Sequence, residues 1–215
     1  GVKEITLLGQ NVNAYNYNAP ERKIKLSNLI SQLKDLKDLK RIRYTTSHPK
    51  DMTKDLIDCH KKVKKLMPCL HLPVQSGSNK ILKSMNRKHT REEYLSIIQN
   101  LVKARPDINF SSDFIVGYPG ETEKDFNDTL SLVKEVNFIN SFSFIYNPRP
   151  GTPASHLKEI DKETQKKRLI ILQNLLEDIQ TKENKKKVGK LKEVLVENKM
   201  KNQSNYFGRA NNSTS

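Results

Sequence analysis

SDFIVGYPGET, residues 112–122, is the stretch from which the fold of this chain can be predicted. The apolar and β-branched residues before Gly117 predict a strand over 109–116. Glycine and proline at 117–120 then predict a turn. A helix follows, because apolar residues after Thr122 recur on one helical face: Phe126, Leu130, Val133 and Val136. The stretch therefore predicts a strand, a tight turn and an amphipathic helix.

The same alternation of strand and helix extends from the first residues to about residue 160. Further strands are predicted over 5–8, 41–46, 69–74 and 138–146. Strands that alternate with helices predict an α/β fold with a parallel sheet, a barrel or part of one. In such folds the chemistry lies at the C-terminal ends of the strands.

The helices between these strands have signals of their own. Apolar residues over 26–33 predict the first helix, with Ser27 as its N-cap. A second stripe, over 52–67, includes Cys59, which is therefore expected in the core. Thr90, with a glutamate three residues later, forms a capping box at the start of the third helix.

The C-terminal part of the chain has a different pattern. A long helix is predicted from about Asp161 to Lys186, and 188–197 then alternates like a strand. The expected domains are a sheet-and-helix domain over 1–160, its long last helix over 161–187, and an incomplete β domain over 188–215. Two or three strands without a partner sheet are marginal in water, so fast amide exchange is expected beyond about Asn198.

The charge of the chain is strongly positive. Lys and Arg number 39 against 24 Asp and Glu, which gives a net charge of +15. Such a balance favours binding to a polyanion such as nucleic acid. A nucleotide-biased genome, which enriches Lys, Asn and Ile, would produce a similar composition without selection for binding.

Several classes of protein are excluded by what the sequence lacks. It has no apolar run long enough to span a membrane and no secretory leader, so a cytoplasmic protein is expected. The two cysteines, Cys59 and Cys69, cannot form a disulfide framework or a four-thiolate metal site. Phosphate-loop, zinc-protease and nucleophile-elbow motifs are all missing.

Polar or glycine-rich sequence follows each predicted strand. These strand ends fall at 9–13, 46–49, 75–78, 113 with 117–121, and 147–149. Because the C-terminal ends of parallel strands meet at one edge, these residues predict a site that hydrogen-bonds a ligand rich in oxygen and nitrogen atoms.

The sequences around these strand ends match a known family. In chain order they read LLGQNVNAY (7–15), RIRYTTSHP (41–49), LHLPVQSGSN (70–79), SDFIVGYPGET (112–122) and FIYNPRPGTP (144–153). Together they resemble the radical S-adenosylmethionine (SAM) methylthiotransferases, most closely the members that modify tRNA. The resemblance spans residues 1 to about 186 and weakens toward the end.

The resemblance implies a fold, a reaction and cofactors. It implies a partial (β/α)6 barrel followed by a small β-barrel domain of the TRAM type, of which 188–215 would be a truncated piece. The implied reaction adds a methylthio group at C2 of N6-isopentenyladenosine beside the anticodon. The implied cofactors are SAM and two [4Fe-4S] clusters. The family's cluster cysteines precede the LLGQN strand, so this chain resembles a C-terminal fragment without the first barrel strand and the cluster loop.

Individual residues follow from the resemblance by position. Cofactor contacts are assigned to Gln10, Asn11, Ser47, Gln75, Ser76 and Asp113, whose polar groups suit the amino acid and ribose of SAM. Arg149 is assigned to tRNA. No catalytic residue and no metal ligand is assigned. Two alternatives stay open: Gln75 and Ser76 could instead cap the following helix, and Arg149 could pair with a nearby carboxylate.

Two other functions stay open for the chain. One is methylthiolation of an aspartate in a ribosomal protein, as in a sister family. The other is a non-catalytic RNA-binding remnant or pseudogene product, since the chain alone lacks the cluster ligands. The expected partners are tRNA and SAM, without a membrane, and the expected state is a monomer.

Overall fold

Neighbouring strands of the main sheet follow each other in chain order. The computed structural model describes residues 1–19, 22–201 and 204–211. Parallel pairs are formed by β1 (Glu4–Leu7) with β4 (Arg41–Tyr44), β5 (Cys69–His71) with β6 (Asn109–Ser111), and β7 (Asp113–Val116) with β8 (Phe142–Ile145). Single parallel bridges, Ile42 with Leu66 and Gln75 with Phe114, join the pairs. Sequential parallel order is what a barrel or part of one has, as the sequence predicted.

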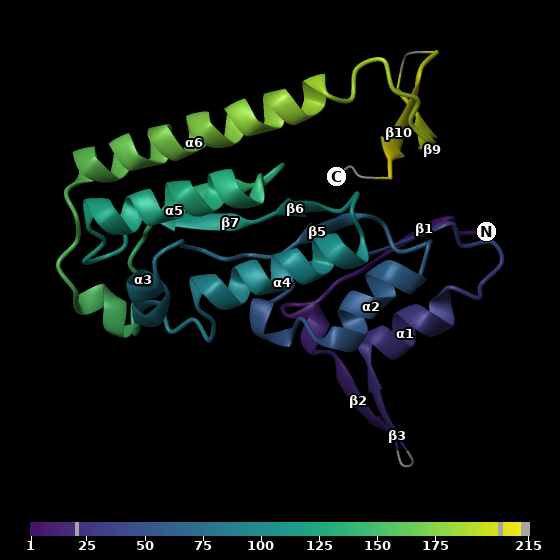
Figure 1. Ribbon diagram of the computed structural model, residues 1–215, viewed down its shortest axis with the longest axis horizontal. Helices are drawn as coiled ribbons and strands as arrows, with labels where there is room; N and C mark the ends of the chain where they lie inside the picture. Colours follow the sequence, from purple (N-terminus) through teal and green to yellow (C-terminus); the bar gives the residue numbers. More distant parts are fainter. Residues whose placement is uncertain (20–21, 202–203, 212–215) are drawn as a thin grey trace.

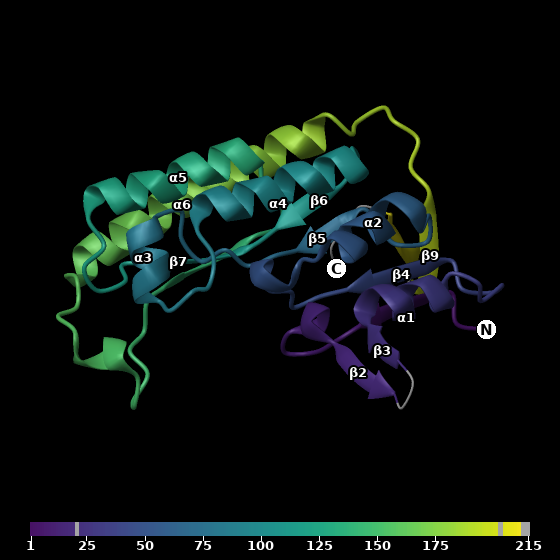
Figure 2. The ribbon, with the colours of Figure 1, turned by 60° about the horizontal axis from the view of Figure 1, so that its bottom comes forward.

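Helices cover the outer face of this curved sheet (Figures 1 and 2). They are α1 (Leu26–Leu33), α2 (Lys54–Lys62), α3 (Asn79–Ser84), α4 (Arg91–Ala104), α5 (Glu123–Val136) and α6 (Lys162–Lys185). Short 3-10 helices lie at η1 (Val12–Ala14), η2 (Pro49–Asp51) and η3 (Pro153–His156). Contacts run from α1 to α2, from α2 to α4 and from α5 to α6, so the helices form a continuous outer layer.

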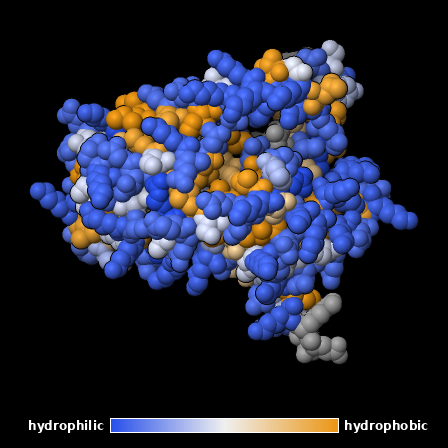
Figure 3. Space-filling view, in the orientation of Figure 1, coloured by the Kyte–Doolittle hydropathy of each residue, from blue (hydrophilic) through white to orange (hydrophobic). Residues whose placement is uncertain are grey.

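A hairpin that the sequence did not predict projects from the body of the molecule. Strands β2 (Asn16–Ala19) and β3 (Arg22–Lys25) pair antiparallel and belong to no larger sheet. The hairpin lies between the end of β1 and the start of α1, and it forms a mostly hydrophilic protrusion (Figure 3).

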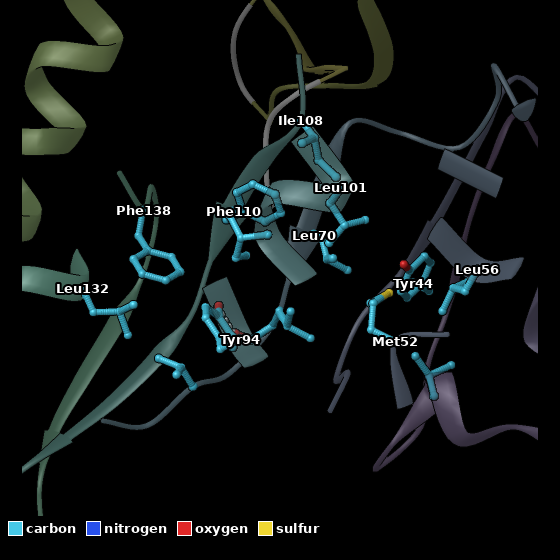
Figure 4. Packing of buried hydrophobic residues seen from close by; sticks show 14 of the residues in the cluster. Tyr44, Met52, Leu56, Leu70, Tyr94, Leu101, Ile108, Phe110, Leu132 and Phe138 are labelled. Atoms are coloured by element: carbon cyan, nitrogen blue, oxygen red, sulfur yellow. Dashed lines mark hydrogen bonds between the residues drawn. The ribbon is translucent and has the colours of Figure 1, made fainter. Parts of the chain in front are cut away.

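The core lies between the sheet and the outer helices (Figure 4). Large side chains of the strands are buried there, including Tyr44, Leu70, Phe110 and Phe114, none of which is more than 5% exposed. Phe114 meets Phe138 edge to face, with 5.3 Å between ring centroids. Burying one such side chain contributes roughly 1.5–3 kcal/mol. Cys59 is buried in the same cluster, which confirms its prediction as a core residue.

Among the described residues, no helix layer covers the opposite face of the sheet. Along β7 and β8, the directly paired residues Asp113 and Phe142 share this inner face with Ile115 and Phe144. Phe142 is 60% exposed and Phe144 is 54% exposed. The inner face therefore combines apolar rings with polar groups, as expected of a surface that faces a ligand or a further part of a protein.

Most predicted helix ends agree with the structure. Thr90 caps α4 with the predicted capping box, and Asp161 caps α6 by accepting a hydrogen bond from the Thr164 amide. The prediction for Ser27 was wrong. Lys25 occupies the N-cap position of α1, and the Ser27 hydroxyl, inside the helix, bonds Asp55 of α2.

The C-terminal strands form a hairpin of their own. β9 (Val194–Lys199) pairs antiparallel with β10 (Tyr206–Ala210), so the strand predicted over 188–197 starts six residues later. The incomplete β domain predicted over 188–215 lies partly outside the described residues, because 202–203 and 212–215 are not among them. A TRAM domain stays a prediction for this segment.

Candidate functional site

The loops at the C-terminal ends of β1 and β4 are bound to each other. The Val12 amide donates to the Thr46 carbonyl at 2.9 Å, and Asn11 Nδ2 donates to Asp51 Oδ2 at 2.7 Å. Two strand ends that are far apart in sequence therefore form one polar edge, as their composition predicted.

Two residues at this edge have strained backbones. Thr46 has φ +63° and Gln75 has φ +76°, the left-handed region that favours glycine. Such a conformation costs of order 1–3 kcal/mol for an ordinary residue and is concentrated at functional sites. The strained backbones lie just after β4 and β5. The surrounding structure therefore holds Thr46 and Gln75 in conformations that the isolated chain would avoid.

Ser47 follows β4 and Gln75 follows β5 at this edge, whereas Asp113 is the first residue of β7. Ser47 is 6% exposed and its hydroxyl has no hydrogen-bond partner, which is costly unless a ligand supplies one. Gln75 and Asp113 are neighbours, because the Gln75 amide donates to the Asp113 carbonyl at 3.0 Å. The candidate site therefore includes the unsatisfied Ser47 hydroxyl, Gln75 and the Asp113 carboxylate, whose Oδ2 lies 3.4 Å from His71 Nε2.

Arg87, in the turn between α3 and α4, also belongs to the candidate site, although the sequence did not predict it there. It follows α3 and interacts electrostatically with Asp113, while its charge also acts on His48 and His89. Burial lowers the pKa of the Arg87 guanidinium, and the Asp113 carboxylate opposes that shift. Its only sequence signal is its place in Met85-Asn86-Arg87, just after the QSGSN string.

The two histidines beside Arg87 are neutral near pH 7. Burial first and the Arg87 charge second lower the pKa of His48. Burial, His48 and Arg87 together lower the pKa of His89 to about 4. The rings meet edge to face at 5.7 Å. Arg87 is the cation whose charge acts on both rings, and the carboxylate with which it interacts is Asp113.

The residues of this chain do not fit a [4Fe-4S] cluster. Cys59 is buried in the core, and the Cys69 thiol accepts a hydrogen bond from Arg43 Nη1 at 2.7 Å. Burial raises the pKa of both thiols, which disfavours the thiolate that iron needs. Within the described ranges no group of three His, Cys, Asp or Glu side chains could hold a metal ion. No step through a cluster is therefore assigned to this chain.

The other predicted site residues are placed differently. Ser76 is fully buried and its hydroxyl lies 3.3 Å from Thr129 Oγ1 on α5, so it points into the helix layer. Gln10 is exposed beyond β1, and the Asn11 amide is held by Asp51. Arg149 is exposed in a turn closed by hydrogen bonds from Thr152 to its carbonyl.

A buried ion pair supports the loop after β7. Glu121 Oε2 accepts from the Gly117 amide and from Arg168 Nη1 of α6, both at 2.8 Å. Burial raises the pKa of Glu121, while Gly117 and Arg168 oppose the shift. A Cβ on Gly117 would lie 2.6 Å from Gln165 Cγ, so the loop and α6 fit closely at this point. The sequence predicts only a turn at 117–120.

Comparison with known families settles the broad identity. Residues 1–133 match the sequence profile of the Radical SAM superfamily. The chain belongs to this superfamily. Solved structures share this fold: a coproporphyrinogen III oxidase from Escherichia coli, described as a radical SAM enzyme, superposes with a TM-score of 0.56 at 19% identity, over 71% of this chain and 37% of that one. A methylornithine synthase gives 0.53 at 12% identity, over 84% and 49%. At such identities the likeness shows the fold alone.

Several curated relatives of this radical SAM chain carry the name tRNA-2-methylthio-N(6)-dimethylallyladenosine synthase. The one from Pelagibacter ubique is 57% identical over 215 residues, which is 100% of this chain and 48% of the relative. The one from Neorickettsia sennetsu is 55% identical over 201 residues, 93% of this chain and 43% of the relative. The chain spans about half the length of the curated relatives it matches. Within its described part, no helix has the length and apolarity to cross a membrane.

Proposed function

We propose that this chain is the C-terminal part of a tRNA methylthiotransferase that adds a methylthio group at C2 of N6-isopentenyladenosine beside the anticodon. The observation that carries the proposal is the 57% identity, along the whole chain, to a synthase named for that modification. The strand-end strings that resemble this family fall at the polar edge of the sheet, where a barrel has its site.

At this edge the chain's own residues would bind SAM, which supplies radical and methyl-transfer chemistry when bound. The Asp113 carboxylate and the Gln75 amide suit hydroxyl and amino donors, and the unsatisfied Ser47 hydroxyl would gain a partner. Arg87 suits the carboxylate of the amino acid, because a guanidinium binds such groups strongly. A role in SAM binding stays a prediction for Gln10, Asn11 and Ser76, because the contacts described above do not support it.

The substrate proposed is tRNA. A net charge of +15 favours phosphate contacts, and Arg149 projects from the loop after β8 as a candidate tRNA contact. The proposal places the protein in the cytoplasm, acting as a monomer, with β9 and β10 as the first strands of a TRAM domain.

A chimeric enzyme tests the proposal. The Pelagibacter relative aligns over 100% of this chain, so residues 1–215 can replace its matching half. The chimera is expressed in a bacterium that lacks its own enzyme, and tRNA nucleosides are measured by mass spectrometry. We expect the 2-methylthio nucleoside to appear. Asp113→Ala and Gln75→Ala should each reduce it, whereas Asp107→Ala, on the surface, should not.

The same cells distinguish the alternatives. Methylthiolation of a ribosomal-protein aspartate without any change in tRNA would support the sister activity. A chimera that is soluble and loaded with iron, but modifies neither substrate, would contradict both enzyme functions.

A further inference from the structure

We propose that the hairpin β2–β3, with the groove at its base, is a binding surface for single-stranded RNA beside the reaction site. The inference rests on the proposed function, because it names the part of the chain that would hold the RNA substrate. It is carried by the hairpin's place, its two faces and its exposed aromatic rings.

The hairpin stands at the edge of the sheet that carries the candidate site. β2 starts just after the loop that bonds to Thr46, and β3 leads directly into α1. The pair projects away from the helix layer (Figures 1 and 2). An RNA loop that brings one base to this edge would meet the hairpin as it approaches.

The two faces of the hairpin differ in chemistry. Register pairs Asn16 with Lys25 and Asn18 with Lys23, so these amides and ammonium groups share one face. Tyr17 pairs with Ile24 on the other face. Lysines suit phosphates and amides suit base edges, while the ring suits stacking on a base.

Packing does not explain the aromatic rings of this segment. Tyr15 is 43% exposed and Tyr17 is 56% exposed, whereas Tyr44 and Tyr94 in the core are 5% and 0% exposed. A lone two-stranded hairpin is marginal in water, and exposed rings add little to it. A partner that covers the rings would account for their exposure in this structure and would stabilise the hairpin.

A groove at the base of the hairpin brings these groups together. Tyr15, Asn16 and Lys25 line it together with Asp51 and Thr53. A flat ring, an amide and a cation in one concavity match an unstacked base with its phosphate. An acidic peptide would match only the lysine, so RNA is the partner that the groove favours.

The test uses the whole 215-residue chain and a fluorescent RNA stem-loop, with a fully paired RNA of equal length for comparison. Binding is measured by anisotropy at several salt concentrations. One variant is Tyr15→Ala with Tyr17→Ala, and the other is Lys23→Ala with Lys25→Ala. The controls are Tyr206→Ala, an exposed ring on β10, and Lys61→Ala with Lys62→Ala on α2. Unfolding midpoints confirm that each variant is folded.

We expect the tyrosine variant to bind the stem-loop about tenfold more weakly, with little change for the paired RNA. The lysine variant should weaken binding and lower the slope of log affinity against log salt by about two. The control variants should bind like the parent chain.

The hairpin inference and the proposed tRNA function can fail separately. If the parent chain binds the stem-loop but both hairpin variants bind equally well, the hairpin inference is wrong and the proposed function stands. The inference would also be overturned if the tyrosine variant lost as much affinity for paired RNA as for the stem-loop. Displacement of the stem-loop by polyglutamate at equal charge would overturn it too. If the parent chain binds no RNA at low salt, the tRNA substrate itself is contradicted.

Discussion

The side-chain amide of Asn13 makes two hydrogen bonds to the backbone of His48. Its Nδ2 donates to the His48 carbonyl at 2.9 Å, and its Oδ1 accepts from the His48 amide at 2.8 Å. Asn13 is 8% exposed, so water has little access to replace these bonds. The pair fixes the loop after β1 to the loop that carries Thr46 and Ser47, and it helps to hold Thr46 in its strained conformation.

Asn13→Ala should lower the free energy of unfolding by about 1–3 kcal/mol, because it leaves the His48 amide without a partner. The His48 carbonyl loses one of its two donors and keeps the Asp51 amide. Urea unfolding measures the loss. The matched control is Asn18→Ala, an exposed asparagine of β2, with an expected change within about 0.5 kcal/mol. Similar losses for both variants would contradict the role of the Asn13–His48 pair.

Gly77 touches the backbone of α5, and a side chain there should be poorly tolerated. An added Cβ would lie against the Asp128 carbonyl oxygen and 2.6 Å from Thr129 Cα. Gly77→Ala must therefore push the loop between β5 and α3 away from α5, at an expected cost of about 3 kcal/mol in unfolding free energy. At Gly9 the nearest atom to an added Cβ is Val12 Cα, at 3.6 Å, so Gly9→Ala should cost much less in the same unfolding measurement.

The helices and the order of the sheet could be predicted from sequence because their signals are local. The capping residues Thr90 and Asp161 mark helix starts, and apolar stripes mark the buried faces. The positions at which strands stop pairing with their neighbours were harder to predict. The strand expected over 69–74 ends its ladder at His71, and Pro73 lacks the amide that a ladder needs. The hairpin β2–β3 lacks a short glycine turn, so nothing local indicated it.

The part of the site that could be predicted lies where neighbouring parallel strands meet. Gln75 and Asp113 are on adjacent strands, so parallel order alone brings them together. Arg87 reaches the site from the turn between α3 and α4, and only helix packing determines that approach. The directions of Gln75 and Ser76 also depend on tertiary structure, since Ser76 bonds to Thr129 on α5.

His89 should make the protein less stable in acid. Both ring nitrogens are buried without a hydrogen-bond partner, and burial, His48 and Arg87 lower the pKa of the ring from 6.5 to about 4. Between these values the unfolded chain binds a proton that the folded chain does not, so stability falls as pH drops from about 7 to 4. At 1.36 kcal/mol per pKa unit, the contribution is roughly 2–3 kcal/mol after partial solvent access is allowed for.

His89→Phe should remove this contribution and reduce the loss of unfolding free energy between pH 7 and pH 4 by about 2–3 kcal/mol. Urea unfolding at the two pH values measures it. His60, whose burial lowers its pKa to about 3, keeps its share of the acid sensitivity in both proteins. His156→Phe, at an exposed histidine, is the control for the substitution itself, and its unfolding free energy at pH 7 should change by no more than about 0.5 kcal/mol. An unchanged pH dependence in His89→Phe would contradict the buried neutral ring.

The C-terminal hairpin should be more protected than its sequence predicts, because two arginines of β4 bind it. Arg41 Nη1 donates to the Arg209 carbonyl at 2.6 Å, and Arg43 Nη2 donates to the Ala210 carbonyl at 3.3 Å. The Arg41 side chain is 2% exposed, so its bonds are shielded from water. The strands β9 and β10 therefore have a partner on the inner face of the sheet, where sequence reasoning expected none.

Arg41→Met should release this hairpin. The methionine fills similar space but leaves the Arg209 carbonyl without its donor, at a cost of about 1–3 kcal/mol. We expect amides of β9 and β10 to exchange about tenfold faster in the variant, while those of α5 and β7 change little. Arg105→Met is the control, since Arg105 bonds Asp107 and the α2 side of the molecule instead. If β9 and β10 already exchange at unprotected rates in the parent chain, the contacts of Arg41 and Arg43 do not hold the hairpin in solution. The sequence-based expectation of fast exchange beyond Asn198 would then be the correct one.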